Sequence, residues 1–246
     1  LSTFEAYFEG KKELFEGLAI ADMEKEWKTY PVFHLDLNAE KYDSPQALVE
    51  ILSRQLTQWE LKYGKGEDEE TLSGRFAGVI RRACEQSGRG VVVLVDEYDK
   101  PLLQALGDDA LLDDYRKTLK AFYGVLKSSD RYLRFVFLTG VTKFAQVSVF
   151  SDLNQLNDIS LDFAYATLCG ITKEELGSTF VPELERQAAV NDMTSEAVME
   201  MMTRRYDGYH FHPKGAGVFN PFSVLNSFSK QEFGSYWFQT GTPTFL

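Results

Sequence analysis

The chain has 246 residues, of which 44% are hydrophobic and 14% aromatic, and this composition is typical of a folded protein with a substantial core. Its 26 basic and 37 acidic residues give a formal net charge of −11, which argues against direct nucleic-acid binding because that affinity comes from neutralising phosphates. No apolar run of about 18 residues occurs and the N-terminus has no signal-peptide pattern, so we expect neither a membrane span nor secretion. Cys84 and Cys169, the only cysteines, suit a reducing cytoplasm better than a disulfide scaffold.

The first stretch of the chain, residues 4–18, has the apolar spacing of amphipathic helices. Gly10 interrupts the pattern, which predicts the tail of one helix, a turn and a second short helix. The chain opens in mid-helix, with Leu1 in place of Met. We therefore expect it to begin partway through a longer protein.

A strand followed by two helices is predicted next. Residues 30–37 alternate between apolar and polar side chains, which indicates a strand. Ser44 and Pro45 have the residue types of an N-cap and a first helical position, and the apolar stripe that follows predicts a helix to about residue 61. A second stripe over residues 72–83 predicts another helix, which ends at Gly88.

The central feature of the sequence is an unbroken apolar run, residues 91–95, that stops at two adjacent acids, Asp96 and Glu97. Such a run is typical of a strand buried on both faces of a parallel sheet. Ligands of open α/β sheets gather at the carboxyl ends of the strands, and two acids there cost desolvation free energy unless a cation or hydrogen-bond donors satisfy them. The pattern resembles the Walker B element of P-loop ATPases, although a strand that runs out into an acidic surface loop is the alternative.

A second strand is predicted to bring a hydroxyl group to the same edge. A helix over residues 109–127 is followed by an apolar strand, residues 132–138, that ends at Thr139 and Gly140. A strand–helix–strand unit places both carboxyl ends at one edge, so the threonine is expected beside the two acids, where it could orient a water or a γ-phosphate. A simple turn threonine is the alternative. Lys143 is the nearby cation that could meet a phosphate, with a solvated surface lysine as its alternative.

Beyond about residue 167 the pattern changes to helices. Thr172 and Glu175 have the spacing of a capping box, and Thr194 and Asn220 have the residue types that begin further helices. The predicted fold is therefore α/β, with an α/β core over residues 1–166 and a mostly helical C-terminal subdomain over residues 167–246.

Several segments, in order along the whole chain, resemble the bacterial AAA-ATPase-like proteins, which often carry a restriction-endonuclease-like nuclease domain at the C-terminus. The segments are Tyr7-Phe8-Glu9-Gly10-Lys11-Lys12-Glu13-Leu14-Phe15-Glu16-Gly17-Leu18, Leu94-Val95-Asp96-Glu97-Tyr98-Asp99-Lys100-Pro101, Leu138-Thr139-Gly140-Val141-Thr142-Lys143, Phe150-Ser151-Asp152-Leu153-Asn154, Tyr206-Asp207-Gly208-Tyr209, Asn220-Pro221-Phe222-Ser223-Val224-Leu225 and Tyr236-Trp237.

The resemblance implies a P-loop NTPase-like parallel sheet with helices on both faces, and ATP and Mg²⁺ as the cofactors of the full-length protein. Asp96 would be associated with Mg²⁺ through water, Glu97 would be the general base or water-orienting group, and Thr139 would be the sensor. Members of the family carry a Gly-rich phosphate loop shortly before the position of Leu1, and no G-x-x-x-x-G-K-[ST] occurs in these 246 residues. We therefore expect weak or absent nucleotide binding by this segment alone, and a nuclease domain, if the protein has one, after Leu246.

Without the strand that precedes the phosphate loop, the sheet would have an unpaired edge along residues 132–138. Pairing of that edge with another chain or a second copy of this one would cover it.

Three functions are compatible with these observations. The first is an ATPase core that uses Asp96 and Glu97, and the second is a nucleotide-independent regulatory or interaction module that retains the fold. The third, a hydrolase that uses Glu97 and Asp99 as a carboxylate pair, lacks an obvious third group, and such pairs normally come from separate elements.

Overall fold

The computed structural model describes residues 1–38, 41–141, 149 and 155–236. The chain divides into two compact units, Leu1–Gln155 and Leu156–Leu246, which are described separately. The division at residues 166 and 167 that the sequence indicates stays a prediction. Among the described residues, no helix has both the length and the apolar character needed to cross a bilayer.

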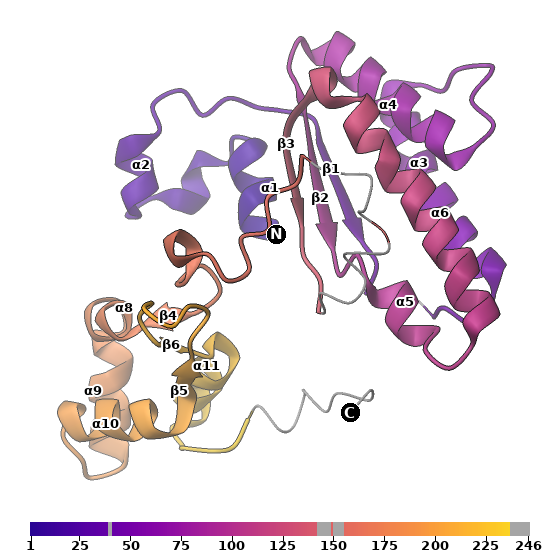
Figure 1. Cartoon of the computed structure of the whole chain (residues 1–246). Coiled ribbons are helices and arrows are strands. Elements are labelled where there is room, and N and C mark those ends of the chain that lie inside the picture. The colour runs from indigo at the N-terminus through magenta and orange to yellow at the C-terminus, as the bar shows by residue number, and fades with distance from the viewer. Residues whose placement is uncertain (39–40, 142–148, 150–154, 237–246) are drawn as a thin grey trace. The chain divides into compact units, whose positions relative to one another are not determined.

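A parallel sheet of three strands forms the centre of the first unit (Figure 1). The strands are β1 (Val32–Asp36), β2 (Val91–Asp96) and β3 (Leu133–Leu138), in the order β1-β2-β3. Residues 91–95 of β2 are each at most 1% exposed, which confirms the predicted strand buried on both faces. Within the described residues β3 pairs with β2 alone, so its outer edge has no partner there.

Helices cover both faces of this sheet, as the sequence predicted. On one face lie α3 (Pro45–Tyr63), α4 (Leu72–Ser87) and α6 (Asp109–Ser128), packed side by side, and α5 (Lys100–Gln104) follows β2. Stacked aromatic rings join α3 to the sheet and α4 to α6, with centroids 4.5 Å apart for Phe33 of β1 and Trp59 of α3 and 4.4 Å apart for Phe76 of α4 and Phe122 of α6.

The other face of the sheet is covered by α1 (Ser2–Phe8). Phe8 packs on Val92 and Leu94, whose side chains alternate with the odd-numbered valines of β2. The second short helix expected in residues 4–18 is the 3-10 helix η1 (Lys12–Phe15), which is followed by the short helix α2 (Ala19–Met23). Gly10 and Gly17, with φ of +72° and +78°, lie on either side of η1 and limit it to one turn.

Local signals account for the ends of the long helices. Ser44 and Pro45 begin α3 as predicted, and the side chain of Thr71 caps α4 by accepting a hydrogen bond from the Gly74 amide at 3.0 Å. Helix α4 ends at Gly88, whose φ of +65° is the left-handed conformation that glycine adopts readily.

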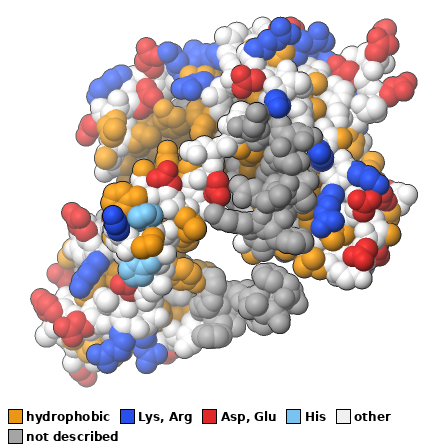
Figure 2. Space-filling view, in the orientation of Figure 1, with side chains coloured by type: hydrophobic (Ala, Val, Ile, Leu, Met, Phe, Trp, Pro, Cys, Tyr) orange, Lys and Arg blue, Asp and Glu red, His pale blue; other side chains and the backbone are white. Residues whose placement is uncertain are grey.

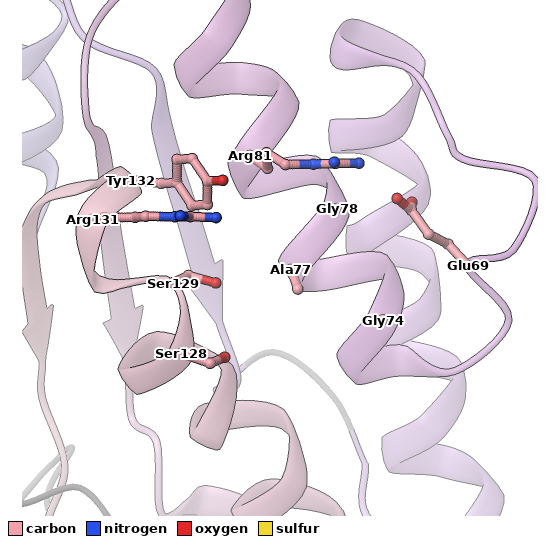
Figure 3. A pocket seen from close by; sticks show the side chains of 9 residues that line it. All are labelled: Glu69, Gly74, Ala77, Gly78, Arg81, Ser128, Ser129, Arg131 and Tyr132. Atoms are coloured by element: carbon pink, nitrogen blue, oxygen red, sulfur yellow. The ribbon is translucent and has the colours of Figure 1, made fainter.

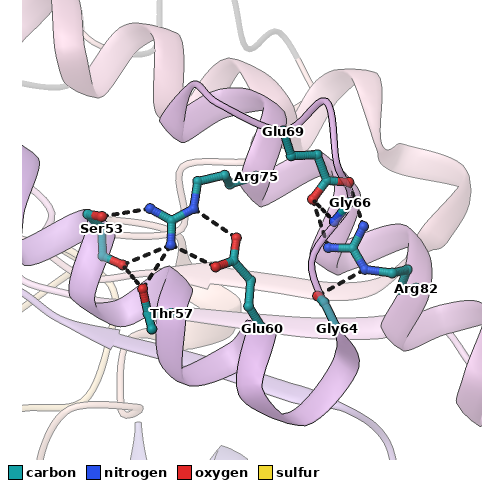
Figure 4. A network of polar contacts seen from close by, with 8 residues as sticks. All are labelled: Ser53, Thr57, Glu60, Gly64, Gly66, Glu69, Arg75 and Arg82. Carbon is teal, nitrogen blue, oxygen red and sulfur yellow. Dashed lines mark hydrogen bonds and ion pairs between the residues drawn. The ribbon is translucent and has the colours of Figure 1, made fainter.

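A polar network joins α3 to α4 (Figure 4). The Arg75 guanidinium donates to both carboxylate oxygens of Glu60, at 2.8 and 2.7 Å, and also to Ser53 and Thr57. Both charged residues are less than 10% exposed. Nearby, Arg82 of α4 donates to both oxygens of Glu69, which lies in the loop between α3 and α4, so the charges of this pair are also satisfied.

The second unit is mostly helical, as predicted, with a small antiparallel sheet in the order β4-β6-β5. Its elements are η3 (Phe163–Tyr165), β4 (Ile171–Thr172), α8 (Lys173–Thr179), α9 (Val181–Val190), α10 (Ser195–Tyr206), β5 (Asp207–Tyr209), β6 (Val218–Phe219) and α11 (Pro221–Lys230). The capping box of Thr172 and Glu175 is confirmed at the start of α8. The small sheet was missed because strands of two or three residues are too short to show alternation.

Candidate functional site

The three parallel strands end in polar residues that share one edge of the sheet. Asp36 is in register with Asp96, and Val95 is in register with Leu138, so the next pair is Asp96 and Thr139. The hydroxyl of Thr139 donates a hydrogen bond to Oδ1 of Asp96 at 2.5 Å. The structure thus brings together the acid and the hydroxyl that the sequence placed at this edge.

Glu97 lies at the same edge in an unusual backbone conformation. Its φ of +49° is in the left-handed region, which costs a non-glycine residue about 1–2 kcal/mol. Its amide donates to Oγ1 of Thr139 at 3.4 Å. Its carboxylate oxygen Oε2 is buried without a hydrogen-bond partner among the described residues and lies 3.7 Å from the Lys100 ammonium. This oxygen therefore has capacity for a water or another donor.

Asp99, unlike Asp96 and Glu97, is enclosed inside the first unit. It is fully buried, and its Oδ1 accepts a hydrogen bond from the Val141 amide at 3.0 Å. A carboxylate enclosed in this way cannot form the solvent-accessible acid pair with Glu97 that the sequence left open. Burial, followed by the charges of Tyr42, Tyr98 and Asp99, raises the pKa of the Tyr123 phenol well above its ordinary value.

The turn after β2 is joined to the end of β3 by several further bonds. The Thr139 amide donates to the Val95 carbonyl and the Tyr98 amide donates to the Thr139 carbonyl, each at 2.9 Å. A Cβ atom at Gly140 would lie 2.4 Å from the Tyr98 ring and 2.8 Å from Oδ1 of Asp99, so the contact requires glycine. These bonds fix the relative positions of the acids and Thr139.

Asp36 is the residue at this edge that sequence reasoning missed. It is exposed, and its side chain accepts a hydrogen bond from the Asn38 amide at 2.8 Å. The available signal was a carboxylate near the end of the alternating segment, residues 30–37, that contains β1. Lys143, the candidate phosphate contact, lies outside the described residues.

Residues 1–150 match the family described as "Predicted AAA-ATPase". The chain belongs to this family. A similar curated protein, the "Uncharacterized protein in vnfD 5'region" of Azotobacter chroococcum mcd 1, is 38% identical over all 246 residues. The chain spans 45% of the length of that relative. No solved structure matches the chain.

For a predicted AAA-ATPase, the donor set at this edge suits a nucleotide-bound Mg²⁺. Carboxylate and hydroxyl oxygens are the ligands this ion prefers, and Mg²⁺ is usually held by one or two carboxylates together with substrate phosphates and water. Among the described residues, no group of three or more His, Cys, Asp or Glu side chains is placed to hold a metal by itself. The carboxylate of Asp96 fits this shared mode of binding.

Proposed function

We propose that the full-length protein binds Mg²⁺-ATP and hydrolyses it at the carboxyl edge of the parallel sheet. In this proposal the sheet is that of a P-loop NTPase, Asp96 is associated with Mg²⁺ through water, and Glu97 is the general base or water-orienting group. Thr139 is the sensor on the neighbouring strand, and Lys143 is a phosphate contact.

The observation that carries the proposal is the hydrogen bond between Thr139 and Asp96 at the end of two adjacent parallel strands. The side chain of Thr139, at the end of β3, is therefore in direct contact with the carboxylate of Asp96, at the end of β2. Family membership supports the same function, since residues 1–150 match a family described as an ATPase.

Each of the chain's own residues has a defined part in the proposed reaction. Bound Mg²⁺ would neutralise charge on the transferred phosphoryl group. Thr139 donates to Oδ1 of Asp96, and Oδ2 of the same carboxylate would be available to a water bound to Mg²⁺. Glu97 would accept a hydrogen bond from the attacking water through Oε2, the oxygen that has no such partner among the described residues.

The test uses the full-length protein, because the 246 residues contain no G-x-x-x-x-G-K-[ST] to grip the phosphates. Glu97→Gln should retain Mg²⁺-ATP affinity and lower turnover by about 100-fold or more, as expected for loss of a general base. Glu67→Gln, which changes a loop acid of the same unit, is the matched control and should change neither quantity. Equal ATP hydrolysis by Glu97→Gln and the unsubstituted protein would refute the role of Glu97.

A second candidate function is a nucleotide-independent regulatory or interaction module. The observation that favours it is the outer edge of β3, which has no strand partner among the described residues and is therefore available to a strand of another chain or a second copy. A full-length protein with no measurable affinity for Mg²⁺-ATP would favour this module over the ATPase.

A further inference from the structure

Lys100, the first residue of α5, places its ammonium group beside the proposed general base. Its Nζ lies 3.7 Å from Oε2 of Glu97, and the two side chains are 30% and 29% exposed. This separation is short enough for an ion pair but longer than the about 2.7–3.2 Å of an N–H···O hydrogen bond. Within the described part of the chain it is the one ion pair that Glu97 forms. Lys100 therefore offsets the negative charge of Glu97 without occupying its oxygen through a hydrogen bond.

The oxygen that faces Lys100 is buried and has its lone pairs available. No hydrogen-bond donor reaches Oε2 of Glu97 among the described residues. Burial of a carboxylate oxygen costs free energy unless a donor or a positive charge compensates it. Here the nearby ammonium supplies the charge and leaves the lone pairs for a water molecule, as required of a group that accepts a hydrogen bond from an attacking water.

The backbone fixes the two residues relative to each other. The Lys100 amide donates to the Glu97 carbonyl at 2.9 Å, and Glu97 has a left-handed φ of +49°, so the pair closes one tight turn. The next two residues, Pro101 and Leu102, are buried and anchor α5 in the first unit. Helices hold side chains more precisely than loops do, so α5 suits a group that positions another side chain.

Glu69, another partly buried glutamate of the first unit, has the opposite arrangement. Arg82 donates to both of its oxygens, at 2.5 and 2.8 Å. It lies beside the hollow between α4 and η2 (Asp130–Tyr132), where Figure 3 shows Arg81 directed toward it as well. Each oxygen of Glu69 is thus engaged by a donor, whereas Oε2 of Glu97 has a compensating charge and no donor among the described residues.

We propose that Lys100 is a positioning residue for Glu97 in ATP hydrolysis. The inference rests on the proposed function, in which Glu97 accepts a hydrogen bond from the attacking water. Lys100 holds the carboxylate by charge at the edge of the sheet and leaves Oε2 free to orient that water. It acts through Glu97 and not by contact with the nucleotide, which separates its role from that of a phosphate-binding lysine.

The first experiment needs no nucleotide and measures whether the two side chains interact in solution. In urea unfolding of the 246-residue chain, Lys100→Met should lower the midpoint by about 0.1–0.4 M more in the unsubstituted chain than in Glu97→Gln, the difference expected for a partly exposed ion pair. Equal shifts in the two backgrounds would show that the pair does not form and would overturn the inference.

The second experiment measures ATP hydrolysis by the full-length protein. Lys100→Met should lower kcat about 10- to 100-fold, as expected when a catalytic group is misplaced, and should leave the affinity for a non-hydrolysable Mg²⁺-ATP analogue unchanged. In Glu97→Gln, the further substitution Lys100→Met should change kcat by less than about twofold, since the group that it positions is already absent. A further tenfold loss in that double variant, or weaker analogue binding by Lys100→Met, would indicate direct action on the nucleotide and would overturn the assignment.

An exposed ion pair of the first unit provides the control. On the face drawn in Figure 2, acidic and basic side chains are interspersed, and exposed pairs contribute little to stability. Lys117 is a matched lysine whose pair with Asp113 is 71% and 58% exposed, so Lys117→Met should leave kcat and the affinity unchanged. A full-length protein that neither binds nor hydrolyses Mg²⁺-ATP would overturn the proposed function together with this inference. Unchanged turnover in Lys100→Met would overturn this inference alone.

Discussion

Replacing Arg75 by methionine should destabilise the first unit strongly, because Arg75 and Glu60 form a buried ion pair. Arg75 is 7% and Glu60 8% exposed, and the guanidinium donates five hydrogen bonds, two of them to Glu60. Its removal leaves the carboxylate buried without a compensating charge, a loss that typically costs about 3–5 kcal/mol. With an m-value of ~2–3 kcal/mol per molar urea, the unfolding midpoint should fall by about 1–2.5 M.

The assay is urea unfolding followed by tryptophan fluorescence. Trp59 precedes Glu60 in α3 and stacks on Phe33 and Phe76, so its emission reports on the packing around the ion pair. The matched control is Lys117→Met, which breaks an exposed pair with Asp113 and should leave the midpoint unchanged.

A double variant separates the ion pair from its surroundings. Arg75→Met combined with Glu60→Met removes both charges and should recover most of the lost stability, since apolar replacement of a whole buried pair is often neutral. A midpoint for Arg75→Met no lower than that of Lys117→Met would refute the reasoning. A double variant as unstable as the sum of the two single variants would show that the loss comes from packing and not from an uncompensated charge.

Two further predictions follow from local contacts. The hydrogen bond from Arg82 lowers the pKa of the Glu69 carboxyl, so its stabilisation is present above the ordinary value of about 4.5 and is lost as the pH falls through the lowered pKa. The stability advantage of the unsubstituted protein over Glu69→Gln, measured by urea midpoints, should therefore be constant from about pH 6 to 8 and shrink below about pH 4.5; an advantage that grew on acidification would contradict this. Gly140→Ala should lower the midpoint, because its Cβ would lie 2.4 Å from the Tyr98 ring, whereas Gly124→Ala, with open space inside helix α6, should raise stability by about 0.5–1 kcal/mol. Equal effects at the two glycines would contradict the close approach at residue 140.

Much of the first unit could be predicted from the sequence because the burial of its strands and helices determines where apolar residues occur along the chain. The run that became β2 is apolar throughout since both of its faces are covered, and its end is marked by Asp96 and Glu97. Thr139 could be placed beside them because parallel strands joined by a helix end at the same edge. These inferences needed only local patterns and one rule of connectivity.

The position of Asp99 could not be predicted in the same way. From the sequence it is one more acid in a turn, yet its carboxylate is fully buried against an amide 42 residues further along the chain. That environment depends on Gly140, which lets the end of β3 approach the turn after β2. The spacing of apolar residues in the sequence does not reveal such a contact.

The contacts around Asp99 explain how an acidic turn can hold a defined geometry. Neighbouring carboxylates repel each other. A residue in the left-handed backbone conformation, such as Glu97, keeps that conformation only when several surrounding contacts hold it in place. Here the end of β3 supplies three constraints: the Thr139 hydroxyl on Asp96, the Thr139 carbonyl on the Tyr98 amide, and the Val141 amide on Asp99. Because all three come from one short segment, a displacement of that segment would move Asp96 and release the conformation of Glu97 together. The proposed sensor is therefore coupled to both acids through hydrogen bonds and does not need to touch the nucleotide to affect them.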